Sequence, residues 1–139
     1  MKLQDKTAIV TGGASGIGEA IVRRFAADGA KVVIADVNAA KGAALAEALG
    51  GPSSALFVKA DMSKDADINE LVIAAVMAFG PIDILVNNAG IVHAANFLDL
   101  KAEDFDRVLG VNLRGTFLLG QAVARLMVER VEDGGPAGA

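Results

Sequence analysis

Short apolar runs alternate with helical patterns along the first ninety residues. The apolar runs contain many β-branched residues and span residues 7–10, 31–35, 55–58 and 82–86. Runs of this length and composition are typical of strands buried on both faces. Helical patterns, with apolar side chains three or four positions apart or a high content of Ala and Leu, span residues 16–27, 39–49 and 65–79. This alternation predicts βαβ units, a parallel sheet and right-handed crossovers.

The pattern changes after the fourth apolar run. A loop is expected from Asn87 to about Leu100, followed by one long helical pattern from about Ala102 to Val131. Gly110 and Gly115 interrupt this pattern, which predicts a kink or a close contact there. Residues 132–139 are expected to form a loop. The predicted fold is a Rossmann-type, doubly wound α/β sheet, truncated after the fourth strand and the following long helix. Residues 1–139 then form a single, incomplete domain.

Composition excludes several classes of protein. The chain has 139 residues, a net charge of −4, no cysteine and one histidine, so disulfides and thiolate or histidine metal sites are not expected. No basic stripe is present to bind nucleic acid, and no apolar stretch approaches the roughly 20 residues of a membrane span. The N-terminus does not resemble a signal peptide, so a cytoplasmic protein is expected. The sequence also contains neither Tyr nor Trp.

A glycine-rich turn follows the first strand. Residues 11–18 read Thr-Gly-Gly-Ala-Ser-Gly-Ile-Gly, and the helical pattern begins within them. Glycines allow a sharp turn and a close approach of the backbone to a ligand, while a helix N-terminus favours a pyrophosphate. The spacing is G-x-x-x-G-x-G, and no Lys-Ser or Lys-Thr follows it, which argues against a Walker-type phosphate loop. The alternative is a glycine-rich turn with no ligand.

An acidic residue, Asp36, ends the second apolar run. A carboxylate at this place can accept hydrogen bonds from both ribose hydroxyls of an adenosine, and it would repel a 2′-phosphate. The neighbouring Ser15 and Val37 are not basic and cannot offset that repulsion. We therefore expect NAD as the cofactor in preference to NADP. The alternative is that Asp36 only caps the end of its strand.

These motifs occur in a recognisable order. The residues concerned are Thr11-Gly12, Gly16-Ile17-Gly18, Asp61, Asn87-Asn88-Ala89-Gly90 and Asn112. Together they resemble the classical short-chain dehydrogenases/reductases over nearly the whole chain. The Asn-Asn-Ala-Gly segment after a fourth strand is much more specific than the glycine turn alone.

The resemblance implies roles for individual residues. Gly12, Ser15, Gly16, Ile17 and Gly18 would form the cofactor turn, and Asp36 would bind the adenosine ribose. Asp61, with Met62 beside it, would bind the adenine amino group, and Asn88, Ala89 and Gly90 would pass beneath the cofactor. Asp61 could instead be a helix N-cap before Asp65, and Asn87-Asn88 could be a polar turn that joins adjacent strands.

The resemblance also implies a catalytic role for Asn112, whose backbone would help to hold a water molecule in a proton relay. The alternative is a surface asparagine. The other three members of the family's catalytic tetrad are a serine, a tyrosine and a lysine, expected on a fifth strand and the helix after it. Because the sequence has no tyrosine, we expect this chain to be inactive alone. His93 lies in the loop after the fourth strand and is expected to line the mouth of the cleft rather than act as a catalyst.

The predicted function is an NAD(H)-dependent oxidoreductase that transfers a hydride to or from a small-molecule alcohol or carbonyl substrate, present here as its cofactor-binding portion. The alternative is a non-catalytic NAD-binding module or half of a split protein. We also expect a homo-oligomer formed through the long helix. The helix supplies apolar surface that the missing half of the protein or a partner subunit should cover, from Leu109, Val111, Leu113, Phe117, Leu118, Val123 and Leu126.

Overall fold

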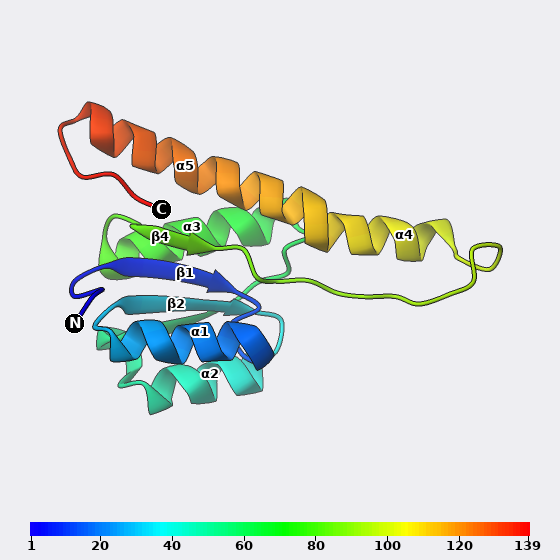
Figure 1. The fold of residues 1–139 in the computed structure, drawn as a ribbon, viewed down its shortest axis with the longest axis horizontal. Helices are drawn as coiled ribbons and strands as arrows, with labels where there is room; N and C mark the ends of the chain where they lie inside the picture. Colours follow the sequence, from blue (N-terminus) through cyan, green and yellow to red (C-terminus); the bar gives the residue numbers. More distant parts are fainter.

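Four parallel strands form the centre of the molecule (Figure 1). The computed structural model describes all residues, 1–139. The strands are β1 (Thr7–Thr11), β2 (Lys31–Asp36), β3 (Ala55–Lys59) and β4 (Ile84–Val86). Their order in the sheet is β3-β2-β1-β4, so β1 lies between β2 and β4. Ala8 is therefore in register with Val32 on one side and with Ile84 on the other.

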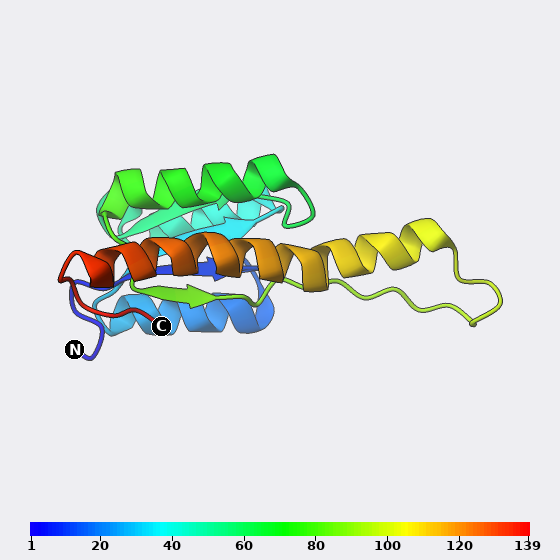
Figure 2. The same cartoon turned by 90° about the horizontal axis from the view of Figure 1, so that it is seen from above.

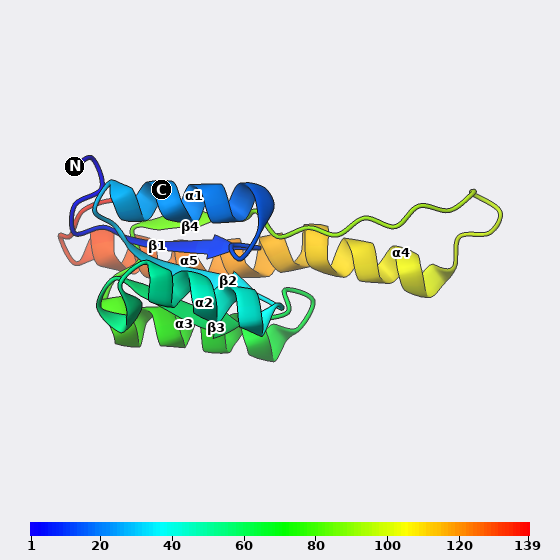
Figure 3. The same cartoon turned by 90° about the horizontal axis from the view of Figure 1, so that it is seen from below.

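Helices cover both faces of this sheet (Figures 1 and 3). One face is covered by α1 (Gly16–Ala27) and α2 (Ala39–Ala48), and the other by α3 (Asp65–Phe79) and α5 (Thr116–Glu132). The remaining elements are η1 (Gly51–Ser53), α4 (Ala102–Leu109) and the π-helical turn η2 (Gly110–Gly115). This is the predicted doubly wound arrangement.

Successive residues of the central strands pack into two separate cores. Ile9 and Val33 pack with Leu71 of α3 and Leu119 of α5, while the next residue in each strand packs against α1 and α2. All five residues of β1 are buried. The continuous apolar runs in the sequence therefore mark strands buried on both faces, as expected.

The fourth strand is shorter than predicted. It begins at Ile84 rather than Ile82, although the Ile82 side chain is buried. At the entry to the strand, the backbone N–H of Thr7 donates to the Asp83 carboxylate at 2.9 Å, and the Asp83 N–H donates to the Thr7 carbonyl. Arg130 also donates to the Asp83 carboxylate at 3.1 Å. A side chain thus takes part in the contact between the two strands where regular backbone pairing was expected.

The long helical pattern is divided into α4, η2 and α5, and the two glycines that interrupt the pattern bound η2. The predicted close contact is present at Gly115, where a Cβ would overlap the carbonyl oxygen of Met62. Figures 1 and 2 show α4 and the segment before it projecting beyond the sheet. Val92, Phe97 and Leu98 in that segment are each at least 90% exposed. None of the helices combines the length and apolarity needed to cross a bilayer.

Residues 133–139 form no helix or strand, as predicted, but their end lies against β4. The N–H of Ala139 donates to the carbonyl of Asp83 at 2.7 Å, and the Ala139 carbonyl accepts from the N–H of Leu85 at 2.9 Å. β4 is an edge strand of the sheet, and this single residue partly pairs its free edge.

Candidate functional site

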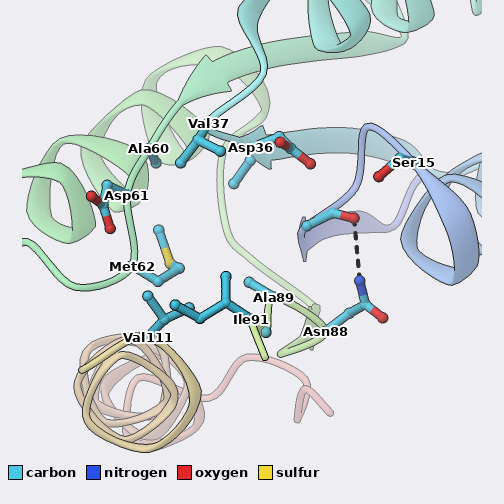
Figure 4. Close-up of a pocket in the computed structure, with 13 residues that line it drawn as sticks. Ser15, Asp36, Val37, Ala60, Asp61, Met62, Asn88, Ala89, Ile91 and Val111 are labelled. Atoms are coloured by element: carbon cyan, nitrogen blue, oxygen red, sulfur yellow. Dashed lines mark hydrogen bonds between the residues drawn. The ribbon is translucent and has the colours of Figure 1, made fainter. Parts of the chain in front are cut away.

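A cleft of about 280 Å³ lies at the carboxyl ends of the parallel strands (Figure 4). It is lined by Gly12, Ser15, Ala35, Asp36, Val37, Ala60, Asp61, Met62, Asn88, Ala89, Gly90, Ile91 and Val111. Ligands of open α/β sheets bind at this edge, where the strand order reverses on either side of the first strand. The structure therefore brings most of the predicted site residues together.

The glycine turn between β1 and α1 is closely packed. Gly12 has φ +62°, in the left-handed region that favours glycine. A Cβ on Gly18 would overlap the Gly12 carbonyl oxygen and lie 2.6 Å from the side-chain nitrogen of Asn88. Gly16, Ile17 and Gly18 support the turn but do not line the cleft, and the Ile17 side chain is 75% exposed.

Helix α1 begins at the cleft with free hydrogen-bonding capacity. Ser15 precedes the helix in an extended conformation, and its hydroxyl makes no capping hydrogen bond. The first backbone N–H groups of any helix lack an intrahelical partner, and the helix dipole places partial positive charge there. An anionic group in the cleft would meet these N–H groups and the Ser15 hydroxyl.

The Asp36 carboxylate joins the glycine turn to the end of β2. Its Oδ2 accepts from the N–H of Ala14 at 3.0 Å, and its Oδ1 accepts from the N–H of Asn38 at 2.9 Å. Asp36 thus caps backbone groups, as the alternative interpretation held, and it also lines the cleft. Each carboxylate oxygen has a second lone pair, so the group can still accept from a ligand.

Asp61 occupies a turn between β3 and α3. Its Oδ1 accepts from the Ser63 hydroxyl at 2.7 Å and from the Ser63 N–H at 2.9 Å. The Ser63 hydroxyl is the main cause that lowers the pKa of Asp61 below its ordinary value, against the opposing effect of burial. Lys64, rather than Asp61, precedes the first residue of α3. The alternative role of Asp61 as the N-cap of that helix is therefore wrong.

Asn88 and Thr11 fasten the loop after β4 to the end of β1. The Asn88 side chain donates to the carbonyls of Thr11 and Gly12 at 3.1 and 3.2 Å, and the dashed line in Figure 4 marks one such bond. The Thr11 hydroxyl accepts from the N–H groups of Asn88 and Ala89 at 3.1 and 3.0 Å. The polar-turn interpretation is thus correct for Asn88, while Asn87 is exposed. Thr11 was part of the motif but was not predicted as a site residue.

Asn112 lies next to the cleft, in η2, and does not line it. Its side-chain oxygen accepts from the Ile91 N–H and its side-chain nitrogen donates to the Ile91 carbonyl, both at 2.8 Å. The residue is exposed, but the oxygen and the nitrogen of its side-chain amide each form a hydrogen bond. Its predicted role in a proton relay stays a prediction.

Five residues that line the cleft were not predicted from the sequence. Ala35, Val37 and Ala60 directly flank predicted residues at strand ends, so their positions alone could have identified them. Ile91 and Val111 reach the cleft only because η2 packs beside the loop after β4, which no local pattern indicates. The prediction that His93 lines the cleft mouth is wrong. Its Nε2 lies 3.4 Å from the carboxylate of Asp104, on α4, and the residue does not line the cleft.

Charges in the cleft have one sign. Asp36 and Asp61 are the only ionisable residues that line it, and no lysine or arginine does so. Apolar side chains such as those of Val37, Met62 and Ile91 supply much of the remaining surface. The cleft thus combines apolar walls with two carboxylates and a helix N-terminus, which suits a ligand with a flat apolar ring, hydroxyl groups and a phosphate.

Known proteins resemble this chain along most of its length. The family model for short chain dehydrogenases matches residues 6–135. Galactitol 2-dehydrogenase of Agrobacterium fabrum is 41% identical over 134 residues, covering 96% of this chain and 52% of the relative. Tropinone reductase-like 1 of Erythroxylum coca is 43% identical over 133 residues, covering 93% of this chain and 48% of the relative.

Solved structures agree with these relatives. The crystal structure of 3-ketoacyl-(acyl-carrier-protein) reductase from Brucella melitensis, complexed with NADH, superposes with a TM-score of 0.90 at 43% identity. The match covers 97% of this chain and 55% of that structure. The chain thus spans about half the length of the proteins it matches. On its sequence, its fold and the cleft at the ends of its strands, this chain belongs to the short-chain dehydrogenase family.

Proposed function

We propose that the cleft binds NAD(H), and that the chain is the cofactor-binding portion of an oxidoreductase acting on an alcohol or carbonyl substrate. The observation that carries this proposal is the joint position of the glycine turn, the N-terminus of α1 and the Asp36 carboxylate at one end of the sheet. The relatives are named as dehydrogenases and reductases, and one related structure contains NADH.

The residues present fit a dinucleotide. A Cβ at Gly18 would overlap the Gly12 carbonyl, so the turn keeps its shape only with glycine there. In the proposed complex, Gly12, Ser15, Gly16, Ile17 and Gly18 form the turn that receives the diphosphate, with the backbone N–H groups of α1 as donors. The adenine then lies against Val37, Ala60 and Met62, with Asp61 at its amino group.

The charge of the cleft favours NAD over NADP. Asp36 can accept hydrogen bonds from the two hydroxyls of an adenosine ribose. A phosphate on the 2′ position would instead lie close to this carboxylate, with Asp61 adding to the repulsion and no basic lining residue to oppose it. Acceptor groups at a ribose and repulsion of a 2′-phosphate both select the unphosphorylated dinucleotide.

The other end of the cleft is formed by the loop after β4. Asn88, Ala89 and Gly90 support the cofactor from below, because Thr11 and Asn88 hold this loop on the end of β1. Asn112 holds Ile91 in place through the oxygen and the nitrogen of its side-chain amide. The nicotinamide ring, when bound, supplies the hydride chemistry of the reaction.

The full reaction needs groups beyond those described. The family resemblance assigns proton transfer to a tyrosine supported by a serine and a lysine, with Asn112 as the fourth member. These 139 residues contain no tyrosine, so we propose that they bind cofactor without turning over substrate. The same observation favours a second candidate, a non-catalytic NAD-binding module or half of a split protein.

Calorimetric titration of the chain with NAD, NADP and 5′-AMP tests the proposal. We expect NAD to bind more tightly than NADP. We also expect AMP to bind, because it needs only the adenosine end of the cleft. Tighter binding of NADP, or no binding of any of the three, would contradict it. Hydride transfer by the purified chain alone, followed at the absorbance of NADH, would contradict the proposed inactivity.

Self-association through the long helix is also proposed, with a smaller surface than the sequence predicted. Val123 is buried against α3, and Val111 and Leu118 pack against the same core. Of the seven predicted side chains, four are exposed: Leu109, Leu113, Phe117 and Leu126. These follow the outer side of α4, η2 and α5, and we propose that a second copy covers them.

A further inference from the structure

The π-helical turn η2 contacts both walls of the cleft: the Asp61–Met62 segment after β3, and the loop at Ile91 after β4. Only Val111 of this turn lines the cleft itself. Figure 4 shows Val111 beside Met62 and Ile91, at the side of the pocket where the helix passes. Met62 follows β3, and Ile91 follows β4, and these strands lie at opposite edges of the sheet. A single helical turn therefore spans the distance between the two ends of the site.

Gly115 is in contact with the wall on the Met62 side. A Cβ on Gly115 would overlap the carbonyl oxygen of Met62 and approach its Cβ to 3.0 Å. Gly115 is buried, and backbone atoms cannot move aside as the end of a flexible side chain can. Any larger residue must therefore displace the Asp61–Met62 segment or η2 itself.

Two side chains of η2 add to this contact. Arg114 forms a bidentate ion pair with Asp65, the first residue of α3, with Nη2 and Oδ2 3.1 Å apart. Asn112 holds the backbone of Ile91 on the other wall. Residues 112, 114 and 115 thus contact three segments that flank the cleft, within one turn of helix.

We propose that η2 sets the separation between the two walls, and that Gly115 and Arg114 are positioning residues for the adenosine end of the cleft. Neither residue lines the cleft, so each acts through Asp61, Met62 and Asp65. Within this π-helical turn, Asn112 contacts Ile91 while Gly115 contacts Met62. Turns of this kind are frequent at functional sites. This inference rests on the proposed binding of a dinucleotide in the cleft.

The test compares Gly115→Ala with Gly120→Ala in the full chain. Gly120 lies on α5, and a Cβ there would meet nothing closer than the Asn87 side chain at 3.8 Å, an ordinary contact. We expect Gly115→Ala to weaken 5′-AMP binding about tenfold and Gly120→Ala to leave it within about twofold. Val123→Ala, a buried change on the same helix, controls for lost stability and should leave AMP affinity unchanged.

A second readout needs no ligand. In ¹⁵N–¹H NMR spectra, we expect Gly115→Ala to shift the amide signals of Asp61 and Met62, and also that of Ile91 through η2. If Gly115→Ala does not fold, Arg114→Gln replaces it, with an expected loss of AMP affinity of about two- to threefold. Exchange of the charges, Arg114→Asp with Asp65→Arg, should then recover part of that loss.

The outcomes separate the two proposals. If the wild-type chain does not bind AMP, the proposed function is contradicted. If it binds AMP, and folded Gly115→Ala binds it equally well with unchanged signals at Asp61 and Met62, only the positioning role is contradicted. Equal losses in Gly115→Ala and Val123→Ala would also contradict that role, because they would reflect stability alone.

Discussion

The side-chain nitrogen of Asn88 donates to the carbonyl oxygen of Gly12 at 3.2 Å, joining residues 76 positions apart in the sequence. The same nitrogen donates to the Thr11 carbonyl, and it would lie only 2.6 Å from a Cβ on Gly18. The end of β1, the start of α1 and the loop after β4 therefore form one packed unit. The shape of the glycine turn depends on a residue from the other side of the cleft.

Replacement of Asn88 by Ala tests this dependence. The variant leaves two carbonyls without their donor, so we expect the free energy of unfolding to fall by about 1–3 kcal/mol. Urea denaturation followed by circular dichroism measures the change. Asn87→Ala is the matched control, because Asn87 is the adjacent, exposed asparagine, and its effect should stay within about 0.5 kcal/mol. Equal effects of the two changes would contradict the special role of Asn88.

Replacement of Asp36 by Ala tests cofactor selectivity. We expect NAD affinity to fall about tenfold, since the ribose loses a charged acceptor, and NADP affinity to fall less or to rise because repulsion is removed. The ratio of the two dissociation constants, from calorimetry, is the quantity to compare with wild type. Asp99→Ala, on the projecting segment far from the cleft residues, should leave the ratio unchanged. A ratio that is also unchanged in Asp36→Ala would refute the role of this carboxylate.

The pKa of Asp61 links the cleft to pH. Donation by the Ser63 hydroxyl lowers this pKa in the folded chain below the value of about 3.9 expected when unfolded. The ionised carboxylate therefore stabilises the folded chain. This stabilisation is fully present at pH values above the unfolded pKa, and it is lost as the pH falls through the folded pKa.

Ser63→Ala removes that hydroxyl. We expect the Asp61 pKa to rise, as measured by ¹³C NMR titration of the carboxyl carbon. The variant should be less stable than wild type at neutral pH, and the difference should shrink as the pH falls below about 3.9. Ser53→Ala, in the exposed turn η1, serves as control and should not move the pKa of Asp61. A difference in stability that is constant with pH would argue against the hydrogen bond as its cause.

The exposed apolar side of η2 and α5 predicts self-association. Leu113 and Phe117 are 64% and 60% exposed, one helical turn apart. We expect light scattering to detect oligomers of the wild-type chain, and Leu113→Ser with Phe117→Ser to shift the population toward monomer. Met77→Ser removes an apolar side chain from a different helix, α3, where it is 82% exposed, and should have no such effect. A monomeric wild-type chain at all concentrations would contradict the prediction.

Elements determined by local pattern were predicted well from the sequence. The helices at Gly16–Ala27 and Asp65–Phe79 have the predicted bounds, because their apolar spacing and flanking residues are local signals. The β-branched runs likewise mark the central strands. Asp36 could be located because strand ends of a parallel sheet meet at one edge, whereas Asn88 was located through the family resemblance.

Features that depend on distant contacts could not be predicted. The apolar period continues through residues 110–115, so the π-helical turn has no periodic signal beyond its two glycines. Its geometry depends on Met62 and Ile91, which lie far away in sequence. The shortened start of β4 has the same kind of cause, since the Asp83 carboxylate contacts the backbone of β1. The missed lining residues Ile91 and Val111 follow from these contacts as well.

The strand order has a consequence for how the chain folds. β1 pairs with β2, the next strand in the sequence, whereas its pairing with β4 must close a much longer loop. Closing longer loops costs more entropy and slows the formation of contacts, so we expect β1, β2 and β3 to assemble first and β4 to dock late. The two sides of the cleft then meet only when β4 docks, so the proposed dinucleotide site would exist only in chains that have completed this late step.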